Sequence, residues 1–195
     1  MMEKLSDLAA GKAGEYLVCA DLILKGHTAF LSEQGLPFDV IADVGGRLLR
    51  VQVKTTRETR SVPQRKETHT PAYLYHIKRC GKRGQGVYAD GDVDLFALVA
   101  LDTRDIGYLP ASLARQTMMF RSSAYRGQYH DEQLKVRCDT IRAMKAGGAT
   151  NAAIAREMGL DLSYVGRVLN GKSGMSEALE TYLTDMTFAK ALAAL

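Results

Sequence analysis

Two short predicted strands joined by a glycine turn constrain this chain more than any other feature of its sequence. Residues 38–43 and 48–54 alternate between polar and apolar side chains, which indicates half-buried strands. Gly45 and Gly46 stand between them, and both can adopt the positive φ values of a two-residue hairpin turn. A hairpin closed at these glycines places Asp39 opposite Gln52, with Lys54 two residues further along the same face.

Three polar side chains therefore converge on one face of the predicted hairpin, because direct and diagonal cross-strand neighbours lie roughly 5–8 Å apart. The Asp39 carboxylate is expected to be the central ligand of a divalent metal, with the Gln52 side-chain oxygen and the Val53 carbonyl as further ligands. Lys54 would orient or activate water and steady a phosphate. For the hairpin alone, the solvent-exposed face of an ordinary hairpin is an equally good interpretation.

A helix is predicted over residues 4–25, and it adds a second carboxylate. Glu15 falls on a stripe of otherwise small or apolar residues at helical spacing: Leu8, Gly11, Val18 and Leu22. A buried carboxylate is costly unless it is paired or bound to a metal, so Glu15 is a candidate metal ligand, directly or through water. The alternative places Glu15 at the edge of the stripe, where it reaches water.

At these residues the chain resembles the PD-(D/E)XK nuclease superfamily. The matching elements are residues 37–39, residues 52–54 and a preceding helix that contains residues 11–15. Gln52 replaces the usual acid, as in group I intron homing endonucleases of this fold, and the helix is similar to that of archaeal Holliday-junction resolvases. Residues 93–99 and 108–110 resemble the later strands of the intron type, so the resemblance covers residues 4–121.

The resemblance implies a restriction-endonuclease-like α/β core with a central mixed sheet. It also implies DNA cleavage that depends on Mg²⁺, with Mn²⁺ as a substitute, and frequent homo-oligomerisation. The catalytic residues that it indicates are Asp39, Gln52, Lys54 and Glu15, and the metal ligands are Asp39, Gln52, Val53 and Glu15.

A basic segment follows the hairpin, although the net charge of the whole chain is only +4. From residue 57 to residue 83, eight basic residues stand against two acidic ones, which favours a phosphate-backbone partner. The candidate DNA contacts are Arg57, Arg60, Arg79, Lys82 and Arg83. A solvated basic loop without a partner is the alternative.

The remaining pattern predicts two domains. Strands are expected over residues 73–78, 94–101 and 117–121, a turn followed by a short strand over residues 104–110, and a helical turn at 111–115. Together with the hairpin and the first helix, they predict a mixed sheet flanked by helices over residues 1–121. Residues 122–131 form a predicted linker. Residues 132–195 are expected to form a small all-α domain whose last helix spans residues 176–195.

Residues 151–170 have the spacing of a helix-turn-helix and resemble those of bacterial repressors and phage proteins. Such motifs place their second helix in the major groove of double-stranded DNA. Here that helix would direct outward Ser163, Tyr164, Arg167 and Asn170, with Lys172 near a phosphate. A three-helix bundle that binds protein or only packs is the alternative, and the neutral charge of this region is compatible with it.

These features together predict a metal-dependent DNA endonuclease, site-specific and of the homing or mobile-element type. The alternatives are a Holliday-junction resolvase or repair nuclease, against which the helix-turn-helix argues, and a non-catalytic DNA-binding regulator, which Gln52 would permit. Three widely spaced cysteines indicate reduced thiols and a cytoplasmic protein. No apolar run approaches the length of a membrane span.

Overall fold

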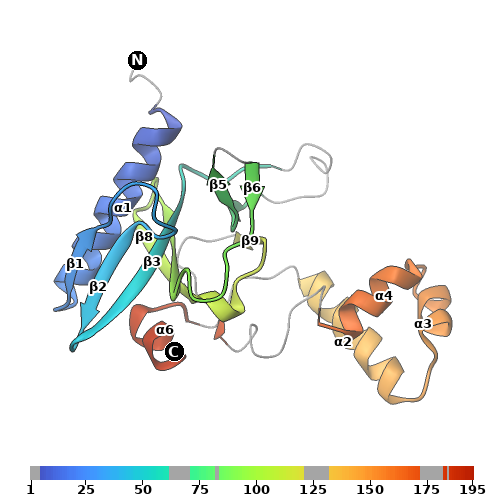
Figure 1. Ribbon diagram of the computed structural model, residues 1–195. Helices are drawn as coiled ribbons and strands as arrows, with labels where there is room; N and C mark the ends of the chain where they lie inside the picture. The colour runs from blue at the N-terminus through green and yellow to red at the C-terminus, as the bar shows by residue number, and fades with distance from the viewer. Residues whose placement is uncertain (1–4, 62–70, 82–83, 121–131, 172–181, 184) are drawn as a thin grey trace. The chain divides into compact units, whose positions relative to one another are not determined.

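In the computed structural model the chain divides into two compact units (Figure 1). The first comprises Met1–Gln128 together with Asp185–Leu195, and the second comprises Tyr129–Thr184. The structure describes residues 5–61, 71–81, 84–120, 132–171, 182–183 and 185–195. No helix within these ranges is long and apolar enough to cross a membrane.

A mixed sheet forms the centre of the first unit, as the sequence predicts. It has five strands in the order β1-β2-β3-β7-β8 and does not include the strands predicted at residues 73–78 and 117–121, which form a separate sheet. The five strands are β1 (Thr28–Leu31), β2 (Val40–Val44), β3 (Arg47–Thr56), β7 (Leu95–Ala100) and β8 (Asp105–Pro110). The central pair β3–β7 is parallel, and the other three pairs are antiparallel. All six residues of β7 are buried, which is expected of a strand covered on both faces.

The β2–β3 hairpin has the predicted turn and register. Gly45 and Gly46 form the turn with φ values of 61° and 88°, and Val40 pairs with Val51. However, β3 is not half-buried as its alternation predicts, because residues 51–53 are all buried. The reason is that β3 lies between β2 and β7, while the first helix packs against it.

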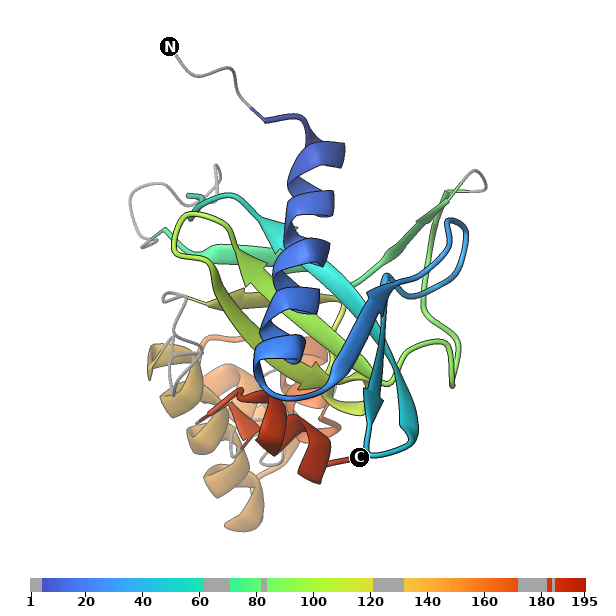
Figure 2. The same ribbon diagram turned by 90° about the vertical axis from the view of Figure 1, so that its left-hand side faces the viewer.

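The helix α1 (Asp7–Leu24) lies across one face of this sheet (Figure 2). Its N-terminus is capped by Ser6, whose hydroxyl accepts a hydrogen bond from the backbone N–H of Ala9 at 3.2 Å. The predicted stripe is partly wrong, since Leu8 is 84% exposed. The face against the sheet is instead formed by Ala10, Gly14, Val18, Cys19 and Leu22.

Two small sheets complete the strands of the first unit. In one, β4 (Tyr73–His76) pairs with β9 (Thr117–Phe120), and in the other, β5 (Arg79–Gly81) pairs with β6 (Gly84–Gly86). The predicted helical turn is present as the 3₁₀ helix η2 (Ala111–Leu113). The sequence does not predict β1, β5 and β6, which are only three or four residues long.

The second unit contains α2 (Glu132–Ala146), α3 (Asn151–Glu157) and α4 (Leu162–Leu169). Thr150 caps α3, and Gly159 makes the turn towards α4 with a φ of 63°. A small apolar core joins the three helices, formed by Cys138, Ile141, Ile154, Ala155, Val165 and Val168. The predicted linker at 122–131 lies outside the described residues.

The C-terminal segment departs from its prediction. Residues 185–187 are not helical, and α6 (Phe188–Ala193) begins after them at a Thr187 cap, so the last helix is shorter than predicted. Residues 185–195 belong to the first unit and not to the helical domain expected over 132–195. The carbonyl of Met186 accepts a hydrogen bond from the backbone N–H of Tyr108 at 2.8 Å, and the Phe188 ring packs 5.0 Å from the Tyr108 ring.

Candidate active site

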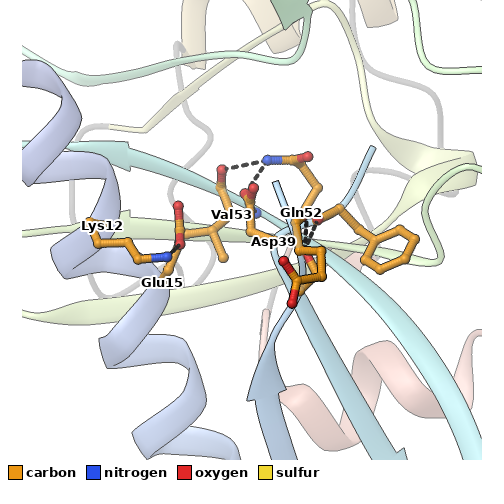
Figure 3. A network of polar contacts seen from close by, with 8 residues as sticks. Lys12, Glu15, Asp39, Gln52 and Val53 are labelled. Atoms are coloured by element: carbon orange, nitrogen blue, oxygen red, sulfur yellow. Dashed lines mark hydrogen bonds and ion pairs between the residues drawn. The ribbon is translucent and has the colours of Figure 1, made fainter. Parts of the chain in front are cut away.

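Asp39 immediately precedes β2 and is held by bonds on both sides. Its backbone N–H donates to the carbonyl of Val51 at 3.0 Å, and its own carbonyl accepts from the backbone N–H of Ser32 at 2.9 Å. Its carboxylate oxygen Oδ2 accepts a hydrogen bond from the backbone N–H of Val53 at 2.9 Å and another from Nε2 of Gln52 (Figure 3). The predicted cross-strand pair of Asp39 and Gln52 is therefore formed.

Two oxygens of this cluster converge on one point. Nε2 of Gln52, which donates to Oδ2 of Asp39, also donates to the carbonyl oxygen of Val53 at 3.1 Å. A single donor atom can contact both oxygens only if they face the same small space. These two oxygens are thus placed to share one cation.

The electrostatic surroundings of Asp39 favour such a cation. Burial raises the pKa of this carboxyl, and the negative charge of Glu15 raises it further. The hydrogen bond from the Val53 N–H and the charges of Lys54 and Lys12 act in the opposite direction but do not cancel the shift of the pKa. A positive charge next to Asp39 would offset the cost of burying its ionised form.

Glu15 reaches this region because α1 packs closely against β3. A Cβ atom added to Gly14 would lie 2.1 Å from Oγ1 of Thr55, so only glycine permits this approach. The next residue, Glu15, has a side chain that is 20% exposed and whose Oε2 accepts a hydrogen bond from Nζ of Lys12 at 2.8 Å. The carboxylate of Glu15 is therefore paired with Lys12, and its charge acts on Asp39 by raising the pKa of that carboxyl.

The ammonium group of Lys54 is held by two groups that the sequence does not predict. Nζ donates to the backbone carbonyl of Lys78 at 2.9 Å and to the hydroxyl of Tyr88 at 2.8 Å. It also lies 5.2 Å from the centre of the Tyr88 ring. No motif or spacing in the sequence points to Tyr88, because its link to Lys54 exists only in the folded chain.

A cleft of about 440 Å³ opens between α1 and the C-terminal part of β3. Its lining includes Glu15, Val53 and Lys54 from the predicted site, together with Gly11, Thr55, Arg57 and Arg60. A Cβ atom added to Gly11 would meet nothing within 4 Å, so no neighbouring atom fills the cleft at this position of α1. Asp39 and Gln52 do not line the cleft but contact Val53, which does.

Residues 6–137 match the family model described as PD-(D/E)XK endonuclease. The chain belongs to the PD-(D/E)XK endonuclease family. Among solved structures, the chain is similar to a bacterial homing endonuclease, I-Ssp6803I, with 18% identity over 58% of this chain and 77% of that chain and a TM-score of 0.46. The search of curated proteins found no match.

The family match contains α1 and the β2–β3 hairpin and ends within α2. Members of this nuclease family generally use divalent metal ions. In the described part of this PD-(D/E)XK endonuclease, no group of three or more His, Cys, Asp or Glu side chains is arranged to hold a metal. The available donors are instead mixed: carboxylates, a backbone carbonyl and an amide. This donor set fits Mg²⁺, which takes oxygen ligands and usually keeps several waters.

The basic residues that are predicted to contact DNA lie in different surroundings. Arg57 donates through Nη2 to the carbonyl of Leu5 at 2.7 Å and to Oδ1 of Asp7 at 2.6 Å, while Arg60 is exposed at the cleft. Arg79 is exposed on β5 and is not among the residues that line the cleft. Lys82 and Arg83 lie outside the described residues.

The predicted DNA-reading helix is α4 of the second unit. Ser163, Arg167 and Asn170 are exposed, and Nη1 of Arg167 donates to Oγ of Ser163 at 3.2 Å. Tyr164 differs from the prediction, because it is only partly exposed and packs against the apolar core of this unit. Its position follows from the helical spacing, since Val165 and Val168 anchor the adjacent face. Lys172 lies outside the described residues.

Proposed function

We propose that this chain is a metal-dependent DNA endonuclease that hydrolyses phosphodiester bonds at the Asp39 cluster, with Glu15 and Lys54 as the other participants. The observation that supports this most directly is the convergence of Oδ2 of Asp39 and the carbonyl oxygen of Val53 on one point. Membership of the nuclease family supports the reaction class.

A divalent ion, Mg²⁺ or Mn²⁺, would be held by Asp39, the Val53 carbonyl and the Gln52 amide oxygen, with Glu15 bound directly or through water. When bound, it supplies a positive charge next to the phosphate and lowers the pKa of water. Gln52 would turn its amide, because its nitrogen faces the two oxygens in this structure. Lys54, a residue that lines the cleft, orients the attacking water or steadies the phosphate.

The substrate we propose is double-stranded DNA, bound by two separate sets of side chains. Arg57 and Arg60 at the cleft, with Arg79, Lys82 and Arg83, would neutralise backbone phosphates without reading sequence. Ser163, Arg167 and Asn170 on α4, with Tyr164 and Lys172, would contact base edges or nearby phosphates. This division suits a site-specific enzyme of the homing or mobile-element type that acts as a homo-oligomer.

The deciding experiment is cleavage of a mixed pool of linear duplexes and four-way junctions, with Mg²⁺ and with EDTA. We expect duplex cleavage that requires Mg²⁺ and that Asp39→Asn abolishes. Asp43→Asn is the matched control, because it lies at the turn end of the same hairpin and an asparagine oxygen can still accept the bond from the Gly46 N–H. Consumption of the junctions alone would indicate a resolvase, and DNA binding without any cleavage would indicate a regulator.

Arg167 tests the role of α4. If its guanidinium contacts a base, Arg167→Ala should reduce discrimination between the preferred site and other sequences by about 1–3 kcal/mol, measured by competition binding. Arg156→Ala on α3 serves as the control, because Arg156 is exposed on the helix that does not enter the groove. An equal loss of affinity for all sequences would make Arg167 a phosphate contact.

A further inference from the structure

Tyr88 lies outside the predicted site, but its side chain contacts Lys54 of that site directly. Its hydroxyl accepts a hydrogen bond from Nζ of Lys54 at 2.8 Å, and the centre of its ring lies 5.2 Å from the same nitrogen. The two distances together place the ammonium beyond the hydroxyl end of the ring, so the hydroxyl oxygen is the group that it contacts, and this bond favours a positive charge. The backbone carbonyl of Lys78 provides another acceptor at 2.9 Å.

The loop that contains Tyr88 is itself well braced. The backbone N–H of Ala89 donates to Oδ2 of Asp92 at 2.9 Å, and the backbone N–H of Asp92 donates to the carbonyl of Ala89 at 3.0 Å. The Tyr88 ring packs edge to face on Phe96, with centroids 5.2 Å apart and planes at 74°. Phe96 is 2% exposed and pairs with Gln52 in the central sheet. The hydroxyl of Tyr88 is therefore fixed relative to the strand that contributes Lys54.

A lysine at a reaction site gains from such an anchor. Its four-carbon stem has many rotamers, and ordering it costs roughly 2 kcal/mol of conformational entropy. Lys54 lines the cleft next to Val53, whose carbonyl belongs to the converging pair of oxygens. Fixing the ammonium before the DNA arrives removes part of that cost from the reaction itself.

We propose that Tyr88 is a positioning residue of the active site, which holds the Lys54 ammonium in place through its hydroxyl. Tyr88 acts through Lys54 and is not itself expected to contact the phosphate. The inference rests on the proposed function for its effect on cleavage, whereas the Tyr88–Lys54 contact can be tested without it.

The first test compares three variants in single-turnover cleavage with saturating enzyme. Tyr88→Phe removes only the hydroxyl, and we expect it to lower the cleavage rate about tenfold while the DNA dissociation constant stays within about twofold. Tyr88→Leu removes the hydroxyl together with the ring that packs on Phe96 and should lower the rate at least as much. Tyr73→Phe is the matched control, because it removes another hydroxyl of the same unit, one that donates to Asp102 at 2.9 Å.

The second test does not depend on cleavage. A brief pulse of acetic anhydride, followed by mass spectrometry, measures how fast Lys54 is acetylated relative to Lys25, an exposed lysine paired with Asp21. We expect Tyr88→Phe to speed acetylation of Lys54 about threefold or more, because one acceptor that holds the ammonium is lost. Tyr73→Phe should leave the ratio unchanged.

The outcomes separate the two proposals. Unchanged acetylation and unchanged cleavage in Tyr88→Phe would overturn the positioning role while the nuclease function stands. Loss of DNA affinity equal to the loss of rate would also overturn it, since Tyr88 would then be a DNA contact. Faster acetylation in a protein that cuts no DNA would keep Tyr88 as the partner of Lys54 and refute the proposed function alone.

Discussion

At position 52 the candidate metal site has a glutamine where its family usually has an acidic residue. Its amide nitrogen donates to both Oδ2 of Asp39 and the backbone carbonyl of Val53, so the neutral Gln52 side chain satisfies both oxygens. A glutamate here would place a second carboxylate beside Asp39, whose pKa is already raised by burial and by the charge of Glu15.

Gln52→Glu should therefore make the protein depend more strongly on its metal. In EDTA we expect a lower melting temperature than that of the wild type, because two carboxylates repel each other. Added Mg²⁺ should raise the melting temperature of the variant more than that of the wild type, since the variant would bind the ion at least as tightly. A variant that Mg²⁺ no longer stabilises would remove Gln52 from the ligand set.

Asp94 shows how one residue joins two strands of the central sheet. Its carboxylate accepts bonds from the backbone N–H of Arg50 at 2.8 Å and from Nε and Nη2 of the same arginine at 3.0 and 2.9 Å. Partial burial acts to raise the pKa of Asp94, but the hydrogen bonds and charge of Arg50 outweigh it, and the pKa is lowered from 3.8. Because the folded state has the lower pKa, this stabilisation is present above pH 3.8 and is lost as the pH falls through the folded value.

We expect Asp94→Asn to lower the free energy of unfolding by about 1–3 kcal/mol at pH 7. The difference from the wild type should shrink as the pH falls below 3.8, where the wild-type carboxylate also becomes protonated. Urea unfolding at both pH values measures it. A difference that is the same at both would mean that the ionised carboxylate is not the stabilising group.

At the scale of the element, the position of α1 depends on one glycine. Gly14 allows the helix to approach Thr55 so closely that a Cβ atom would stand 2.1 Å from the hydroxyl oxygen. Gly11, one turn earlier on the same helix, has no such neighbour within 4 Å. The two glycines therefore have different roles, one in packing and one in leaving the cleft open.

Gly14→Ala should destabilise the fold by about 1–3 kcal/mol, because α1 or Thr55 must move to admit the methyl group. It should also slow cleavage, since Glu15 moves with the helix. Gly11→Ala is the control and should leave stability unchanged or raise it by up to about 1 kcal/mol through helix propensity. Chemical denaturation measures both, and equal effects of the two changes would refute the close-packing argument.

At the scale of the whole molecule, the chain returns to its first unit after the helical unit. Phe188 is 2% exposed, and its ring lies 5.1 Å from the His27 ring and 5.0 Å from the Tyr108 ring. The C-terminal segment therefore belongs to the core of the nuclease unit, and both ends of the helical unit connect to that unit.

Phe188→Ala should accordingly destabilise the nuclease unit by about 3–5 kcal/mol, the usual cost of emptying a buried phenylalanine site. Leu195→Ala, at a side chain that is 42% exposed, should have little effect. Urea unfolding of the full chain, followed by near-ultraviolet circular dichroism of its tyrosines, measures the difference. A stability equal to that of the wild type would mean that α6 adds nothing to this core.

Alternation and turn residues were enough to predict the hairpin register, the turn at Gly45–Gly46, the pairing of Asp39 with Gln52 and most of the strands, because they act between near neighbours. Three features were decided only by the tertiary structure: the face of α1 that packs on the sheet, the partners of Lys54 and the return of residues 185–195 to the first unit. Each depends on contacts between residues far apart in the chain, such as the 34 positions that separate Lys54 from Tyr88. Local periodicity contains no information about such contacts, because they form only when the packed core brings the segments together.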